Sequence, residues 1–155
     1  MANPFMVRAI ELSAENVRGG RGGPFAAVVV RDGKIVAEGA NRVTSSNDPT
    51  AHAEIVAIRE ACKRLGVFAL AGCEIYCSCE PCPMCLAAIY WARLARIYFA
   101  NTAADAARIG FDDSFIRREI ARPRSRRKIA AVPIMRRAAL GAFRAWEKTP
   151  GKIPY

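Results

Sequence analysis

Residues 73–101 read CEIYCSCEPCPMCLAAIYWARLARIYFAN, and this stretch decides the fold. Its beginning, residues 73–79, is typical of a strand that has to end before Pro81. Residues 82–93 then have the pattern of a helix, and residues 95–101 that of a second strand. A strand, a crossover helix and another strand form a unit in which the two strands run parallel. The stretch therefore predicts two neighbouring parallel strands joined by a helix.

Further elements are predicted before this unit, and each begins or ends at a local signal. The turn pair Asp32-Gly33 lies between two β-branched runs and predicts an antiparallel hairpin. Asp48 suits the N-cap of a helix with Pro49 at its first position, and Gly66 suits its end. The predicted elements are a helix over 4–18, strands over 24–30 and 34–40, and a helix over 48–65.

Beyond residue 101 the pattern is weaker. It predicts a short helix over 114–120, a weak strand over 131–135 and a last helix over 138–148. Strands alternating with helices predict a three-layer α/β/α sandwich around a mixed sheet of about five strands. With 155 residues and no linker or internal repeat, we expect residues 1–155 to form a single domain.

The net charge of +10, from 24 basic and 14 acidic residues, is concentrated in one segment. Residues 117–137 carry nine bases and one acid, a local net charge of +8. Such a run is either a solvated loop or a contact for a polyanion. The apolar run Leu86–Ala92 is too short to cross a membrane, and the N-terminus lacks a signal-like apolar stretch. We therefore expect a cytoplasmic protein with no membrane contact.

Five of the six cysteines crowd into residues 73–85, a spacing typical of metal binding. Cys82 and Cys85 would share one face of a helix start, where the helix dipole favours thiolates. With His52 they provide three protein ligands for zinc, which leaves the fourth position to water, as in catalytic sites. Glu54 would reach the same site only from the first turn of its helix, as a proton shuttle.

Two other interpretations of the cysteines need weighing. Cys79, Cys82 and Cys85 resemble the start of a ferredoxin run, but Ile89 stands where the fourth cysteine belongs. A closed structural zinc site recruiting Cys79, Cys77 or Cys73 remains open on spacing alone. We favour the catalytic zinc site with His52, Cys82 and Cys85 as ligands, because His-x-Glu followed by Pro-Cys-x-x-Cys is the signature of zinc deaminases.

At these motifs the chain resembles the cytidine deaminase-like superfamily, in DPTAHAE at 48–54 and EPCPMC at 80–85. The likeness continues outside the metal motif and is closest to the bacterial guanine deaminase branch. The further matching segments are GGPF at 22–25, AIYWAR at 88–93, GFDDSF at 110–115 and a terminal tyrosine.

The resemblance implies a purine-base pocket beside one zinc ion per subunit. It also implies a homodimer with exchanged C-terminal segments, so that Tyr155 joins the pocket of its own or a partner subunit. The residues implied to bind the base are Phe25, Asn41, Ala53, Trp91, Asp113 and Tyr155. Each has a plainer interpretation from sequence alone: core packing for Phe25 and Trp91, a turn for Asn41, an N-cap for Asp113 and a frayed tail for Tyr155.

The implied reaction is the hydrolysis of guanine to xanthine and ammonia, with related aminated heterocycles such as ammeline as further substrates. The alternative is a tRNA adenosine deaminase that forms inosine, which the net charge favours. A pocket closed by the C-terminal tail leaves no path for a polynucleotide, so a nucleic-acid partner is not expected. A nucleic-acid module with structural zinc is a third possibility, but it gives Glu54 no role beside His52.

Overall fold

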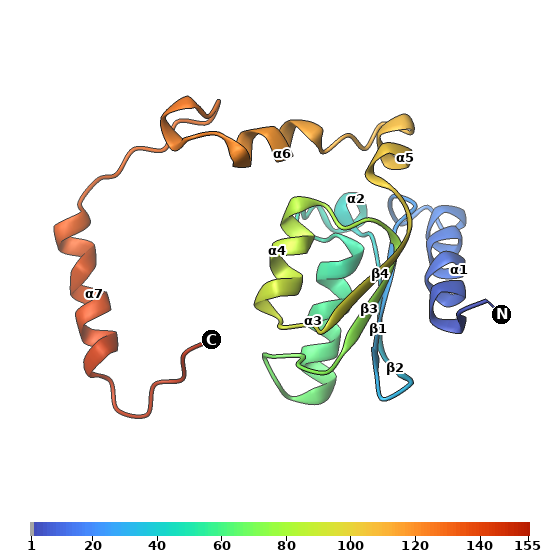
Figure 1. Ribbon diagram of the computed structural model, residues 1–155, viewed down its shortest axis with the longest axis horizontal. Helices are drawn as coiled ribbons and strands as arrows, with labels where there is room; N and C mark the ends of the chain where they lie inside the picture. The colour runs from blue at the N-terminus through green and yellow to red at the C-terminus, as the bar shows by residue number, and fades with distance from the viewer. Residues whose placement is uncertain (1) are drawn as a thin grey trace. The chain divides into compact units, whose positions relative to one another are not determined.

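The computed structural model describes residues 2–155, which form two compact units (Figure 1). The first unit ends at Asp113 and contains the sheet, and the second is Ser114–Tyr155. None of the helices in the described part of the chain is long and apolar enough to cross a membrane.

The first unit is built on a mixed four-stranded sheet in the order β2-β1-β3-β4. The expected hairpin is present, because β1 pairs antiparallel with β2 around a turn in which Asp32 and Gly33 both have positive φ. β1 also pairs antiparallel with β3, and β3 pairs parallel with β4, as the crossover predicted. The strands are β1 Ala26–Arg31, β2 Lys34–Ala40, β3 Glu74–Cys79 and β4 Arg96–Asn101.

Helices cover both faces of this sheet (Figure 1). Alternate residues of β1 divide the core: Val28 and Val30 pack on the side of α1, Pro4–Arg18, whereas Ala27 and Val29 pack with α3, Ala53–Leu65. Helix α4, Pro83–Trp91, lies on the same face as α3. The three-layer α/β/α architecture is therefore confirmed, with four strands in place of about five.

The fifth strand was predicted wrongly. Residues 131–135 form no strand in the second unit, all of which the structure describes; they are exposed, and Pro133 lacks the N–H that a ladder needs. That unit consists of α6 Ser114–Ala121, the 3₁₀ turn η1 Arg124–Arg126 and α7 Arg136–Lys148, and none of its residues is buried.

The helix expected from residue 48 begins later, at Ala53. Asp48 instead closes a local turn, because its Oδ1 accepts hydrogen bonds from the backbone N–H and the hydroxyl of Thr50, at 2.8 and 2.7 Å. Two short helices were not predicted, α2 Val43–Ser46 and α5 Ala103–Arg108. The second starts with a capping box between Thr102 and Asp105.

Candidate zinc and substrate site

Two helix N-termini meet at the candidate site. His52 is the N-cap of α3 and Cys82 is the N-cap of α4, and both have extended backbone conformations. Pro83 is the first residue of α4, a position where its missing N–H costs nothing. One ligand atom each from His52, Cys82 and Cys85 lies within 4.8 Å of the other two. The sequence motifs thus converge in space, although they are separated by about thirty residues.

The electrostatics of this group suit a cation. A hydrogen bond from the Cys85 thiol and another from His52 lower the pKa of Cys82 to about 4. The same contact with Cys82, together with burial, raises the pKa of Cys85. The hydrogen bond to Cys82 raises the pKa of His52. These contacts favour the thiolate form of Cys82, and a bound metal would deprotonate both thiols.

The donor set and its spacing fit zinc. The distance from His52 Nδ1 to Cys82 Sγ is 3.6 Å. Tetrahedral zinc with nitrogen at about 2.0 Å and sulfur at about 2.3 Å would separate these two atoms by about 3.5 Å. Two thiolates and one imidazole are also ligands that zinc prefers over harder cations. His52, Cys82 and Cys85 could therefore hold zinc with little rearrangement.

The remaining cysteines near the site do not join this group. Among the residues that the structure describes, the ligand group contains only His52, Cys82 and Cys85. Burial and the nearby Glu54 carboxylate raise the pKa of Cys77 and raise that of Cys79 to about 11, which favours their thiol forms. The geometry therefore gives no support to a closed four-thiolate site.

Glu54 is the second residue of α3 and is only 8% exposed. Burial raises the pKa of its carboxyl, and contact with the Cys85 thiol partly opposes this shift. The charges of Cys82 and His52 also act on this carboxyl, which places it next to the candidate metal ligands. A carboxyl held here, and not itself one of the three ligands, can exchange protons with a reacting molecule.

Three of the expected base-binding residues lie where the sheet meets α3. Asn41 directly follows β2 and is buried, and Ala53 is the buried first residue of α3. Phe25 directly precedes β1 and is half-buried, and its backbone oxygen accepts a hydrogen bond from the Asn41 N–H at 3.0 Å. Gly39 lets α3 approach β2 closely, because a Cβ there would lie 2.3 Å from the carbonyl oxygen of Ala53.

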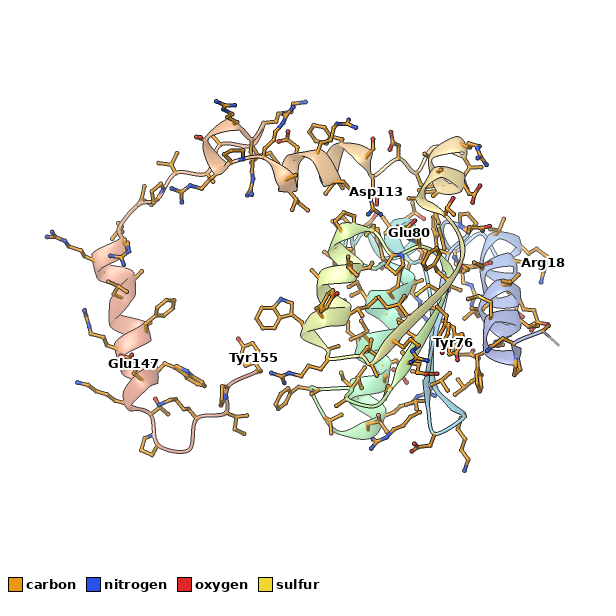
Figure 2. The ribbon with its side chains drawn as sticks, viewed as in Figure 1. Arg18, Tyr76, Glu80, Asp113, Glu147 and Tyr155 are labelled. Atoms are coloured by element: carbon orange, nitrogen blue, oxygen red, sulfur yellow. The ribbon has the colours of Figure 1, made fainter. Side chains whose placement is uncertain are left out.

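The other three expected residues are less enclosed. Trp91 is the last residue of α4 and is 67% exposed, and Asp113 is half-buried at the end of the first unit (Figure 2). Tyr155, the last residue of the second unit, is 75% exposed. The structure thus gathers the candidate metal ligands, Glu54 and three of the expected base-binding residues within the first unit, whereas Trp91 and Tyr155 are largely exposed.

Phe111 is a further candidate residue, next to Phe25, that the sequence did not single out. Its ring contacts the ring of Phe25 edge-on, with centroids 4.9 Å apart. It follows α5, whose start is held by a hydrogen bond from the Ala103 N–H to the Glu80 carboxylate at 3.0 Å. Its place within the GFDDSF motif was the available signal.

Residues 2–101 match the family described as the cytidine and deoxycytidylate deaminase zinc-binding region. With this match and the site above, the chain belongs to the zinc-binding deaminase family.

Within that family, the chain matches guanine deaminases over nearly its whole length and a tRNA-specific adenosine deaminase over about half of it. The chain is 53% identical to guanine deaminase from Bacillus subtilis, over 97% of both chains. The X-ray structure of guanine deaminase from the same species superposes with a TM-score of 0.95 over 99% of both chains, at 52% identity. A guanine deaminase structure from Nitrosomonas europaea is 32% identical, with a TM-score of 0.69, and the match covers 94% of this chain and 85% of the other. The tRNA-specific adenosine deaminase of Agrobacterium fabrum is 50% identical, but over only 49% of this chain and 50% of its own.

Proposed function

We propose that this protein hydrolyses guanine to xanthine and ammonia. The observation that carries the proposal is the extent of its similarity to the Bacillus subtilis guanine deaminase, which includes the segment after residue 101. The tRNA-specific adenosine deaminase covers only about half of the chain. The zinc chemistry is common to deaminases of both substrates, so the preference for a free base rests on the parts of the chain that the match to the guanine deaminase covers and the match to the tRNA-specific deaminase does not.

His52, Cys82 and Cys85 would hold one zinc ion per subunit. A zinc ion held by these three residues would lower the pKa of the attacking water to about 7, which makes it a nucleophile at neutral pH. Glu54 accepts the proton of the attacking water and delivers it to a ring nitrogen of guanine as the C2–O bond forms. It then takes the remaining proton from the oxygen added at C2 and delivers it to the exocyclic amine as the C2–N bond breaks, so water and guanine give xanthine and ammonia.

The pocket residues orient the base for this attack. Asn41 and the backbone N–H of Ala53 offer polar contacts to the edge of the purine, and Phe25 and Trp91 offer apolar faces. The Asp113 carboxylate would accept N–H groups of guanine, which adenine lacks at the corresponding positions. A buried polar group that pairs with one base and not another discriminates by much more than apolar contact does.

The active form is proposed to be a homodimer in which the C-terminal segment of each copy closes the pocket of the other. The second unit has two helices but no buried residue, so it forms no core of its own. Its exposed apolar side chains include Phe143 and Trp146, and the first unit exposes Tyr90 and Trp91 on α4. Apolar surfaces of this kind mark interaction sites, and Tyr155 would complete the pocket from the partner.

The substrate assay compares two molecules on the zinc-loaded full-length protein. Guanine is followed by ammonia release and by the ultraviolet change on xanthine formation, and an anticodon stem-loop is followed by inosine formation. We expect guanine turnover and no inosine. Inosine formation without guanine turnover would establish the tRNA activity instead. If neither xanthine nor inosine forms, the proposed reaction is contradicted.

A second experiment tests the exchanged segment. Light scattering should give the mass of a dimer for the full chain, and Tyr155→Ala should raise KM for guanine while the mass and the zinc content stay unchanged. Mixing Tyr155→Ala with Glu54→Gln should restore part of the activity, because a mixed dimer contains one intact composite site. A monomeric mass, or no restoration in mixed dimers, would contradict the exchange.

A further inference from the structure

Asn16 is a buried polar side chain on a helix that carries none of the proposed catalytic residues. It lies on α1 and is 1% exposed, on the same helical stripe as Phe5 and Ala9, which pack on the sheet. Burying a carboxamide is costly unless its polar atoms are hydrogen-bonded. A polar residue on an otherwise apolar stripe therefore requires a specific set of partners.

Both hydrogen bonds donated by Asn16 go to backbone carbonyls of the site. Its Nδ2 donates to the oxygen of Gly23 at 2.9 Å and to the oxygen of Asn41 at 3.0 Å. Gly23 lies in the loop before β1, and Asn41 follows β2. One NH₂ group thus joins two segments that are eighteen residues apart in the chain.

This link also determines how Asn41 presents its side chain. Asn41 Oδ1 accepts hydrogen bonds from the N–H groups of Gly23 and Val43, at 3.4 and 3.2 Å. These two donors turn the Asn41 carboxamide so that its Nδ2 is the end left for a ligand. Within the described chain, residues 2–155, that Nδ2 has no hydrogen-bond partner.

The same carbonyl group connects Asn16 to Phe25. The oxygen of Gly23 accepts from the Phe25 N–H at 2.8 Å as well as from Asn16. A shift of Gly23 would therefore move the proposed aromatic wall and the proposed base-reading amide together. Displacements of about 1 Å in such groups can cost on the order of 100-fold in rate.

We propose that Asn16 is a positioning residue for the purine pocket: its carboxamide fixes the loop before β1 against the end of β2, so that Phe25 and Asn41 are held in place for the base. The expected effect of Asn16 on turnover rests on the proposed function, because it assumes that guanine is the substrate. Its structural content, a side chain that orders the backbone at Gly23 and Asn41, does not depend on which base is bound.

The kinetic test uses Asn16→Leu, which removes both donors but keeps the number of side-chain heavy atoms, and Asn16→Ser, a smaller variant with one donor that serves if the leucine variant does not fold. We expect kcat/KM for guanine to fall about tenfold to 100-fold, mainly through KM, with unchanged zinc content. In an Asn41→Ala background the same change should cost less than in the wild type, because one of the two residues through which it acts is gone and only the effect through Phe25 remains. Equal losses in both backgrounds would overturn the proposal.

Arg8→Met is the matched control on the same helix. Arg8 joins α1 to β2 through Glu38, at 2.8 and 2.9 Å, and contacts none of the pocket segments through these bonds. It should lower the melting temperature without raising KM. A rise in KM equal to that of the Asn16 variants would mean that loosening α1 is sufficient, and would also overturn the proposal.

A readout without substrate separates this inference from the proposed function. In amide hydrogen exchange, Asn16→Ser should accelerate exchange at Phe25 and Asn41, whose N–H groups are bonded within the linked segments. Arg8→Met should leave the exchange of those two amides unchanged. Unchanged exchange in Asn16→Ser contradicts the positioning role even if guanine is turned over, and faster exchange supports it even if another base is the substrate.

Discussion

Substituting Gly39 by alanine tests whether the contact between β2 and α3 sets the catalytic geometry. Gly39 faces the first turn of α3, and a Cβ added there would lie 2.3 Å from the oxygen of Ala53 and 2.5 Å from the nitrogen of Ala57. Both contacts are with backbone, so no flexible side chain can turn aside. The helix itself has to move, and His52 and Glu54 move with it.

The size of the effect follows from these distances. Cβ atoms essentially never approach other heavy atoms closer than 3.0 Å, so the contact at 2.3 Å requires a displacement of at least about 0.7 Å. Overpacking of this kind costs about 1–3 kcal/mol of stability. A misplacement approaching 1 Å lowers rates by up to about 100-fold, so we expect kcat/KM for guanine to fall about 10- to 100-fold.

Gly33→Ala is the control for a general loss of stability. Gly33 has a φ of 70° in the hairpin turn, and an added Cβ there meets no atom within 4 Å. The strained backbone should cost about 1–2 kcal/mol without moving α3. Steady-state kinetics, zinc content and denaturant unfolding are measured for both variants. Full kcat/KM in Gly39→Ala, at a loss of stability similar to that of Gly33→Ala, would refute the reasoning.

Three further predictions concern charge, metal and substrate. The Arg8 guanidinium lowers the pKa of the Glu38 carboxyl. The pair therefore stabilises the fold fully above the unfolded pKa of about 4.5, and this contribution is lost as the pH falls through the lower folded pKa. Arg8→Met should lower the free energy of unfolding in urea by about 1 kcal/mol at pH 7 and by progressively less below pH 4.5, and a difference that stays constant with pH would contradict this linkage. Cys85→Ser should reduce zinc, measured by mass spectrometry, well below one ion per subunit and abolish turnover, and retained stoichiometric zinc would remove Cys85 from the ligand set. Asp113→Ala should lower kcat/KM for guanine at least tenfold with zinc retained, and unchanged kinetics would limit Asp113 to a role in chain geometry.

The central part of the fold was predictable because its signals are local. Pro81 after the strand pattern of residues 73–79, the Asp32-Gly33 turn and the helical pattern of residues 82–93 each act over a few residues, and the crossover rule then orders the strands. The convergence of His52 with Cys82 and Cys85 was predictable for a different reason, because His-x-Glu and Pro-Cys-x-x-Cys together form the zinc deaminase signature, although spacing alone left a four-thiolate site open.

The sequence predictions were wrong or incomplete where competing local interactions or contacts between distant residues determine the structure. Asp48 was expected to cap a helix, but its side chain closes a turn on Thr50 and the helix starts at Ala53. The expected strand at 131–135 has neither a neighbouring strand nor buried surface. Asn16 was not singled out, although a polar residue on the apolar stripe of the first helix was visible in the sequence. Its partners lie in loops that no periodicity describes.

The most direct test of the account is the Glu54→Gln variant of the zinc-loaded protein with guanine as substrate. The substituted carboxamide would keep the shape of the side chain but could not accept a proton, and general acid–base catalysis contributes about 10²–10⁴-fold. We predict a fall in kcat within that range, while zinc stays at one ion per subunit and the melting temperature does not decrease. Full turnover with zinc bound would contradict the proposed role of Glu54 and with it the mechanism.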